Sequence, residues 1–506
     1  MKIYHTMFWT LVLLCINVHA NTISKTDALQ KAKSFLSAKD NKASVETYSI
    51  LGKAEMYKVV TDEGWCLLSS EKSVKPVLAY STIADFPKEE EMPEGMKWLF
   101  ALYEEVIAYA KTHAEEDGGR NIWETDDNQY NSPLSNRTET VYLSRLGTVK
   151  WGQSANNNSG SANCQKIYNK FCPDFHSLYC NRTIVGCGAV ALGQVLWYYQ
   201  WPYYGLIPLT MLNDQGLVSS EQEYRFYDWE LMPDQILNST SITEVDTLAA
   251  FLRDCGYAEH MQYKDSSSTT YVSDIKNALN NNFGYTTAIY LSRNDQPSNW
   301  VERMKDEIRN GRPVIYRGGN NRGGHFFVLH GFSGDYFNIN WGWSGSYNEV
   351  MCTLDSIYYA HNHHYNYDQW AIINIAPGYS PSCSLLVIPS TDVLPTNFMI
   401  QNGGTITIGD RTITSGMHGT IFSGESVTLA NGFKIEEGAE VYIDIRDMHC
   451  DDERNFSPSF DSSIRNIRHA PQQQQVSSSA RKILRNNQIL ILRGEKTYTL
   501  TGQQLK

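Results

Sequence analysis

A nearly unbroken apolar run from Ala189 to Tyr199 limits how this chain can fold. A helix that is apolar on every side has to be buried, because an exposed helix keeps one polar face. Pro202 ends the run, and Cys187 stands at its start between two glycines. A thiol at that position meets the positive end of the helix dipole and free backbone N–H groups, which favour the thiolate. On these residues alone, Cys187 could equally be one more buried cysteine.

A thiolate nucleophile needs an imidazole within hydrogen-bond reach, and His325 is our candidate. It lies in the strand-like run 323–331, and a second run, 336–341, follows the turn signal at 333–335. We predict a hairpin centred on Ser333. That register pairs His325 with Trp341, Phe327 with Ile339 and Leu329 with Phe337.

Two polar neighbours of this hairpin receive separate predictions. Strand alternation turns His330 to the other face, so we expect it to be a partly exposed polar residue rather than a partner of Cys187. Asn340 could orient the imidazole, as the third member of a Cys-His-Asn site does. Alternation places Asn340 on the face away from His325, so this role requires the chain to turn at Gly342.

Length and composition bound the broad class. The 506 residues allow about two to four domains. The net charge of −12 argues against a nucleic-acid-binding chain, which needs a basic surface. Residues 1–20, with Lys2 before an apolar stretch and a small-residue site at Ala20, are typical of a secretory signal peptide. No later apolar stretch is long enough to span a bilayer, so we expect a secreted or cell-surface-attached protein without a transmembrane segment.

The cysteines and histidines give no support for a metal or cofactor. Ten cysteines are present, and nine remain once Cys15 leaves with the signal peptide, so at least one stays unpaired within the chain. No Cys-x-x-Cys pair occurs, which removes the basis for a zinc ribbon. The cluster of His361, His363 and His364 could bind a metal, but its Asn and Tyr neighbours favour a solvated loop. We therefore expect neither a metal nor a cofactor.

The chain divides by composition. Residues 21 to about 115 combine helical and alternating stretches, and a polar segment with linker composition follows to about 140. The aromatic-rich region 141–378 contains all the candidate chemistry. Short strands separated by Gly and Asp turns indicate a small all-β domain at 379–450. A polar, Gln-rich linker at 451–480 and a tail at 481–506 complete the chain.

Several motifs in one order resemble the streptopain family of secreted cysteine peptidases, a branch of the papain-like superfamily. They cover roughly residues 142–377 and comprise Lys150-Trp-Gly-Gln153, Tyr168-Asn-Lys-Phe-Cys-Pro173, Gly186-Cys187 with Gln194 and Trp201-Pro202, Gly256-Tyr257 with Tyr263, Ser266 and Ser267, Ala278-Leu-Asn-Asn-Asn-Phe-Gly-Tyr285, Gly324-His325, and Asn340-Trp-Gly-Trp343. The resemblance implies an α+β fold, with a two-lobed papain-like peptidase domain preceded by an α+β propeptide. The all-β domain predicted from the strand pattern lies outside the part of the chain that resembles the family.

The resemblance also implies roles for individual residues. Cys187 would be the nucleophile, His325 the general base and acid, Gln153 an oxyanion donor and Trp341 the indole beside the imidazole. Ser267 and Gly324 would line the substrate site, and Asn340 would be auxiliary. Residues 21–140 would be an inhibitory propeptide with its activation linker, so the protein would be a zymogen whose partners are protein or peptide substrates and its own propeptide. A sorting role for 481–506 is a hypothesis.

Three departures from the family pattern bear on substrate preference and site shape. Residues 154–165 are an insertion after Gln153, His330 stands where Asp is usual, and Gly188 follows the nucleophile where Val is usual. Two rival functions stay open. The same thioester chemistry could transfer an acyl group to an amine, or the chain could be an inactive surface-binding protein.

Overall fold

The computed structural model describes most of the chain. The described residues are 22–39, 42–113, 121–125, 138–154, 163–174, 180–264, 267–295, 299–320, 323–354, 368–377, 385–394 and 396–445, with four strands between 480 and 505. The predicted signal peptide, the linker 451–479 and the histidines between 361 and 364 lie outside the described residues. No helix among the described residues has the length and apolar character needed to cross a membrane.

The N-terminal unit is a four-stranded antiparallel sheet with two long helices. Its elements are α2 (Lys25–Leu36), β1 (Ser44–Tyr48), β2 (Met56–Thr61), β3 (Gly64–Leu68), β4 (Val77–Ser81), η1 (Glu89–Glu91), α3 (Glu94–Thr112) and α4 (Ile122–Thr125). Ser24 caps α2 by accepting a hydrogen bond from the backbone N–H of Asp27, because its side chain supplies an acceptor that the first helical turn lacks.

The central unit contains the apolar helix predicted from the sequence. Its elements are β5 (Thr140–Tyr142), α5 (Ser144–Thr148), α6 (Cys187–Tyr199), β6 (Tyr204–Pro208), β7 (Gln222–Phe226), η2 (Trp229–Leu231), α7 (Ile242–Ala258), α8 (Val272–Asn281), β8 (Ile289–Ser292), α9 (Trp300–Arg309), β9 (Val314–Asn320), β10 (Gly323–Ser333), β11 (Tyr336–Asn340), β12 (Met351–Thr353) and β13 (Trp370–Ile373). Every residue of α6 after Cys187 is buried, as its all-round apolar sequence requires. The mixed α+β class expected from the sequence is confirmed.

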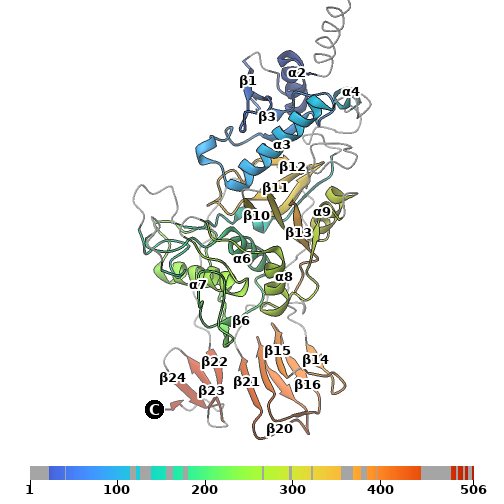
Figure 1. The fold of residues 1–506 in the computed structure, drawn as a ribbon. Helices are drawn as coiled ribbons and strands as arrows, with labels where there is room; N and C mark the ends of the chain where they lie inside the picture. Colours follow the sequence, from blue (N-terminus) through green and yellow to red (C-terminus); the bar gives the residue numbers. More distant parts are fainter. Residues whose placement is uncertain are drawn as a thin grey trace, which may run out of the picture.

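One sheet runs through both units. Its strand order is β1-β2-β3-β4-β12-β11-β10-β9-β13-β8, with β5 paired to β10. The joint is the antiparallel pairing of β4 with β12, which sets Tyr80 opposite Met351 and Ala79 opposite Cys352. The N-terminal unit thus extends the central sheet at its β12 edge, and Figure 1 shows α3 crossing the region where the two units meet.

The predicted hairpin forms, but its register differs from our expectation. Leu329 pairs with Ile339, not with Phe337, and Phe332 pairs with Phe337. The main cause is the position of the turn, which is centred between Gly334 and Asp335 because Ser333 itself pairs with Tyr336. A β-bulge between Leu329 and Gly331 then adds one residue to β10 and shifts the register by one step. A symmetric count from the turn cannot detect such an insertion.

The expectation that His330 is partly exposed is wrong, because its ring is packed against a neighbouring strand. His330 is the residue that the ladder skips, and only 1% of it is exposed. Its ring packs against Tyr142 of β5 at 5.1 Å between ring centroids, and neither ring nitrogen has a partner among the described residues. Burial lowers the pKa of His330 to about 3, so the side chain is a neutral core residue.

The C-terminal unit is built from short parallel strands. Its elements are β14 (Leu386–Ile388), β15 (Asn397–Asn402), β16 (Ile406–Ile408), β17 (Thr412–Ile413), β18 (His418–Ser423), β19 (Val427–Leu429), β20 (Lys434–Ile435) and β21 (Glu440–Ile445), followed by β22 (Ala480–Arg485), β23 (Gln488–Arg493), β24 (Lys496–Thr499) and β25 (Gln504–Leu505). The strands β14-β16-β19, β15-β18-β21 and β17-β20 pair in parallel, so the chain winds in successive coils. The sequence predicted four of these strands but not their parallel winding.

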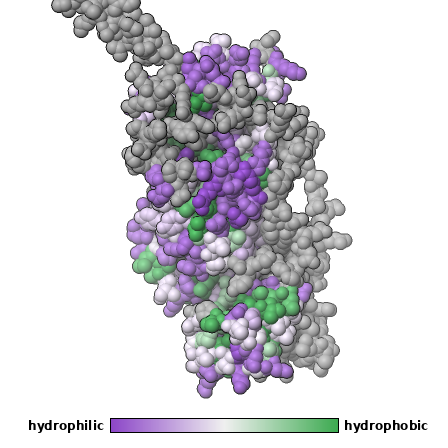
Figure 2. Space-filling view, turned by 90° about the vertical axis from the view of Figure 1, so that its right-hand side faces the viewer, coloured by the Kyte–Doolittle hydropathy of each residue, from purple (hydrophilic) through white to green (hydrophobic). Residues whose placement is uncertain are grey.

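The C-terminal unit packs on the β6–β7 hairpin of the central unit. Phe422 stacks on Tyr204 with ring centroids 3.4 Å apart, and the Tyr204 hydroxyl donates to Asp444 at 2.6 Å. Gln401, in the same row of the sheet, accepts from the backbone N–H of Tyr203 at 3.2 Å. The contact lies beyond the C-terminal end of α6, at the opposite end from Cys187 (Figure 1). Figure 2 shows apolar residues gathering on one face at the level of this unit, below a largely hydrophilic middle region.

Candidate active site

Cys187 occupies the first position of α6, where the chain enters the helix through Gly186. The φ of Gly186 is 91°, a conformation that favours glycine, and a Cβ there would lie 2.4 Å from the Met261 methyl group. The Cys187 sulfur accepts a hydrogen bond from the backbone N–H of Phe326 at 3.4 Å. Among the described residues, Cys187 is the one free cysteine that is not fully buried.

His325 lies on β10, with its imidazole close enough to the Cys187 thiol for each group to shift the ionisation of the other. Its Nε2 lies 3.0 Å from the carbonyl oxygen of Trp341, which leaves the other ring nitrogen for the sulfur. Only 4% of His325 is exposed, so the pair meets in a site that largely excludes water. The structure therefore brings together the thiol and imidazole singled out in the sequence.

The two groups shift each other's ionisation. Burial opposes charge on Cys187, but His325, by its charge and hydrogen bond, and the N–H groups of Phe326 and Gly188 outweigh it and lower the pKa of the thiol. Burial likewise disfavours the imidazolium, yet Cys187 and the Trp341 carbonyl raise the pKa of His325. Both shifts favour a thiolate–imidazolium pair, the state in which such a sulfur is nucleophilic.

Gln153 is tied to the loop that leads into α6. Its carbonyl oxygen accepts a hydrogen bond from the backbone N–H of Val185 at 2.9 Å, two residues before Cys187. The residue is partly exposed. This backbone contact ties Gln153 to the loop that leads into Cys187.

Two indoles flank the imidazole in different ways. Trp341 is fully buried, supplies its carbonyl to His325 and packs its ring against Phe327 at 5.1 Å between centroids. The ring that meets the His325 ring edge-on, at 6.1 Å between centroids, belongs to Trp343. Our sequence reasoning assigned the indole role to Trp341 alone and missed Trp343, although both lie in the Trp-Gly-Trp motif.

Asn340 does not reach the imidazole. Its side-chain N–H groups donate to the carbonyls of Leu146 at 3.2 Å and Val149 at 2.8 Å, and its oxygen accepts from Gln194 of α6 at 2.9 Å. Alternation along β11 turns the side chain away from His325, as the strand geometry required, and the turn at Gly342 does not bring it back. Asn340 holds α6 to its surroundings, and the Trp341 carbonyl occupies the position facing the imidazole.

The two predicted substrate-site residues have different environments. Ser267 is exposed, whereas its neighbour Ser268 is buried and donates to the carbonyl of Ile184 at 2.7 Å, next to the nucleophile's loop. Gly324 lies beside His325 under the side chain of Arg317, whose Nη2 is 2.5 Å from the place of a Cβ. Ser268 was not singled out in the sequence, and the run of three serines gave no means to choose among them.

The N-terminal unit covers this site. A Cβ on Gly95, at the start of α3, would lie 2.7 Å from Cδ2 of His325 and 3.1 Å from the Trp341 ring, so α3 approaches the imidazole as closely as a glycine allows. One turn further along, Trp98 donates its indole N–H to the carbonyl of Gly319 at 2.8 Å. The dyad is therefore assembled but covered.

Comparisons with known proteins agree with this architecture. Residues 163–350 match the model of the Peptidase C10 family, and residues 20–107 match that of the Spi protease inhibitor. The chain is 27% identical over 374 residues to the thiol protease/hemagglutinin PrtT of Porphyromonas gingivalis, covering 69% of this chain and 40% of that protein. It is 27% identical over 190 residues to streptopain of Streptococcus pyogenes, covering 35% of this chain and 48% of streptopain. These matches support a streptopain-like cysteine peptidase region at residues 163–350, preceded by an inhibitor-like region at residues 20–107.

A solved structure shows the same fold over about two thirds of this chain. The prointerpain A fragment of Prevotella intermedia superposes with a TM-score of 0.50 at 24% identity, covering 66% of this chain and 98% of that fragment. The present chain spans less than half the length of the curated relatives above.

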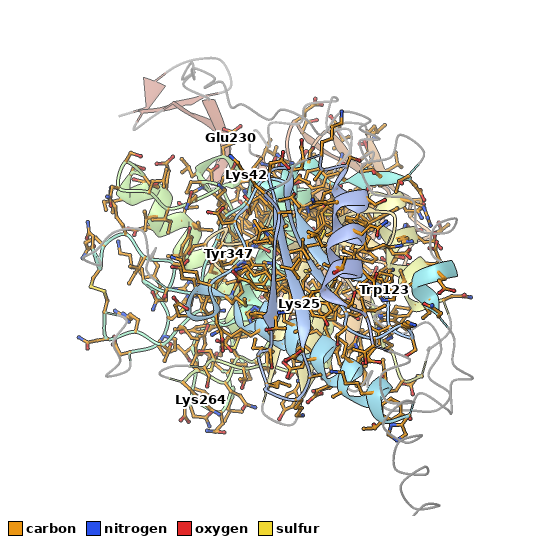
Figure 3. The ribbon with its side chains drawn as sticks, turned by 90° about the horizontal axis from the view of Figure 1, so that it is seen from above. Lys25, Lys42, Trp123, Glu230, Lys264 and Tyr347 are labelled. Carbon is orange, nitrogen blue, oxygen red and sulfur yellow. A yellow bond between two sulfur atoms is a disulfide. The ribbon has the colours of Figure 1, made fainter. Side chains whose placement is uncertain are left out.

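A disulfide lies near the end of the inserted segment. Cys164 and Cys180 are bonded, with Cα atoms 5.6 Å apart, and the bond lies at the periphery of the molecule (Figure 3, yellow bond). It joins the end of the inserted segment to the loop that precedes α6. Among the described residues, no cluster of three or more His, Cys, Asp or Glu side chains could hold a metal ion.

Proposed function

We propose that this chain is a secreted cysteine endopeptidase made as a zymogen. The observation that carries the proposal is the electrostatically coupled pair of Cys187, at the start of the buried α6, and His325 on β10. The Cys187 sulfur also accepts from the backbone N–H of Phe326, the residue after His325. The match to the Peptidase C10 family supports a cysteine-type peptidase. The roles of the individual residues are part of the proposal.

In the proposed reaction, the Cys187 thiolate attacks the carbonyl carbon of a peptide bond, and the carbonyl π electrons move to oxygen. The Gln153 side chain and the backbone N–H of Cys187 donate to that oxyanion, and losing one such donor typically costs about 3–4 kcal/mol. Protonated His325 gives its proton to the leaving amine as the C–N bond breaks. Neutral His325 then takes a proton from water, which attacks the thioester and returns the thiolate.

The zymogen part of the proposal rests on the N-terminal unit. Residues 20–107 match an inhibitor model, and α3 lies against His325 through Gly95. The unit is also held by the β4–β12 ladder and by Lys75, which pairs with Asp335 of the C10 domain at 3.0 Å. Removing this unit would open the site to an extended peptide. The polar linker predicted from residue 115 to about residue 140 would be the region to cut.

Secretion is supported by the signal-like residues 1–20 and by the Cys164–Cys180 disulfide, because disulfides persist mainly in oxidising compartments. Surface attachment through 481–506 stays a hypothesis. It would be tested by deleting this segment and measuring how much protein stays on cells and how much enters the medium.

The decisive experiment uses the full-length chain with casein as substrate. We expect Cys187→Ala and His325→Ala to lose both casein cleavage and self-processing, and His418→Ala, a histidine exposed on the C-terminal unit, to retain both. Wild-type cleavage by Cys187→Ala would overturn the proposal. Measuring amine incorporation alongside hydrolysis separates a peptidase from an acyl transferase.

A further inference from the structure

A fully buried glutamate lies beside the nucleophile and has no role in the dyad. Glu259 follows the last turn of α7 and is 0% exposed. Neither oxygen of its carboxyl group has a hydrogen-bond partner among the described residues. Buried carboxyl groups are normally paired or hydrogen-bonded, so an unpartnered one next to an active site requires a reason.

The carboxyl group fills space that a side chain at position 188 would need. A Cβ on Gly188 would lie 2.8 Å from Oε1 of Glu259 and 2.6 Å from Cγ2 of Thr270. Thr270 is in turn fixed to this place, because its hydroxyl donates to the backbone carbonyl of Glu259 at 2.7 Å. The glycine that departs from the usual family pattern and the buried glutamate are therefore complementary in shape.

Gly188 connects this carboxyl group to the sulfur. The backbone N–H of Gly188 donates to Cys187 and is one of the groups that favour the thiolate. The Glu259 carboxyl group therefore packs next to the backbone of Gly188, whose N–H stabilises the Cys187 thiolate. The sulfur also acts on Glu259 directly, since its charge disfavours ionisation of the carboxyl group.

The other groups around Glu259 also disfavour a negative charge. Burial raises the pKa of Glu259 well above its usual value, and Cys187 of α6 and Asp274 of α8 raise it further. Cys255 of α7 and Tyr263, whose own ionisation Glu259 opposes, are further titratable neighbours. Two histidines lie nearby: His260, the next residue, acts on Asp274, and His325 is coupled to Cys187. Burial and the two acids still favour the protonated carboxyl group.

We propose that Glu259 is a positioning residue for the nucleophile: its protonated carboxyl group fills the space over Gly188, and loss of that proton at higher pH places a negative charge beside the Cys187 thiolate and reduces its reactivity. The inference rests on the proposed role of Cys187 as the nucleophile. It does not depend on which peptide is cleaved.

The first test measures alkylation of Cys187 by iodoacetamide in the full-length chain between pH 5.5 and 8.5, with the modified residue located by peptide mapping. Glu259→Gln keeps the shape of the side chain and cannot ionise. We expect the ratio of the variant rate to the wild-type rate to rise from about 1 at the acidic end to roughly fivefold or more at the alkaline end, since one pKa unit of coupling is tenfold. A ratio that stays constant across this range would overturn the proposal.

A matched control exists in the N-terminal unit. Glu71 is 2% exposed, its Oε1 also lacks a partner among the described residues, and burial raises its pKa to about 7. Glu71→Gln should leave the alkylation profile of Cys187 unchanged. A pH-dependent ratio of the same size in this variant would show a general effect of neutralising buried acids and would count against a role specific to Glu259.

The second test needs no reactivity at all. A group whose pKa is raised on folding makes the folded state less stable as pH rises from its unfolded to its folded value. The Tm of Glu259→Gln minus that of wild type should therefore increase with pH above about 4.5. If casein cleavage fails in every protein but this Tm difference appears, the peptidase proposal fails while the protonated carboxyl group stands. A Tm difference that does not change with pH would show that Glu259 is not held protonated by folding, and would overturn the proposal.

Discussion

Two fully buried glutamates in this molecule have opposite surroundings. Glu104, in α3 of the N-terminal unit, accepts hydrogen bonds from four backbone N–H groups, those of Ile50, Leu51, Lys53 and Ala54. Glu259, beside the nucleophile of the C10 domain, accepts none from the described residues through its carboxyl group. Both residues are 0% exposed, so burial alone does not separate them.

The donors decide the charge. Burial by itself would raise the pKa of Glu104, but the four N–H groups outweigh it and lower the pKa below its usual value. Without donors, burial raises the pKa of Glu259. A charged carboxylate therefore organises the loop 49–54 of the inhibitor-like unit, whereas a neutral carboxyl group packs against the site. The comparison teaches that the hydrogen-bond donors around a buried acid, rather than its depth, indicate its role.

The strongest test of this comparison is Glu104→Gln. The amide is neutral, and its NH2 group would face the backbone N–H groups of the loop 49–54. The loop would therefore lose part of its hydrogen-bond acceptor. We expect a loss of about 3–5 kcal/mol in the free energy of unfolding, measured by urea denaturation, because breaking a buried charged arrangement leaves unpaired groups. Glu105→Gln, an exposed neighbour paired with Lys53, should change stability by less than about 0.5 kcal/mol. Equal effects of the two variants would contradict the comparison.

The next test concerns the contact between the two regions. Gly95→Ala adds a methyl group 2.7 Å from Cδ2 of His325, so α3 has to move away from the dyad. An overpacked contact of this kind costs about 1–3 kcal/mol, which corresponds to roughly a fivefold or greater increase in the alkylation rate of Cys187 in the uncut chain. Lys97→Ala, which removes an exposed pair with Glu94 on the same helix, should leave the rate unchanged. An unaltered rate in Gly95→Ala would show that α3 does not limit access.

The smallest expected effect is the pH dependence of Tm, which should have opposite signs in Glu104→Gln and Glu259→Gln. Glu104, with a lowered pKa, stabilises the fold above its unfolded pKa, and that stabilisation is lost as pH falls through the folded value. Its Gln variant should therefore approach wild-type Tm at acidic pH, whereas Glu259→Gln should approach it at acidic pH and exceed it as pH rises. We expect changes on the order of a few degrees, followed by thermal unfolding at several pH values. The same direction of change with rising pH in both variants would break the comparison.

Much of the fold could be predicted from residue patterns. The all-apolar run predicted α6 and its burial, and the patterns in residues 21 to about 115 predicted both helices and strands there. The parallel coils of the C-terminal unit could not be predicted, because a short alternating strand looks the same whether its neighbour runs parallel or antiparallel. The bulge in β10 was also invisible, since one extra residue leaves the composition of a strand unchanged.

The site divides in the same way. Cys187 and His325 stand out because a helix start and a strand with defined flanking residues limit where they can lie. Trp343, Ser268 and Glu259 depend on contacts between segments distant in the chain, which no local pattern encodes. The only local sign of Glu259 was Gly188, which is small where the family usually has a larger residue.

The shared sheet gives maturation a structural cost of its own. While β4 is in place, β12 has a neighbour on each side, and the hydroxyl of Tyr103 donates to the carbonyl of Thr353 at 2.6 Å. Departure of the N-terminal unit would turn β12 into an edge strand. Its backbone N–H and C=O groups on that side, including those near Cys352, would then have no neighbouring strand. Such edges recruit other strands. After removal of the N-terminal unit, this edge would have to be covered by another part of the chain. Otherwise it could pair with the same strand of a second molecule, which would lead to self-association.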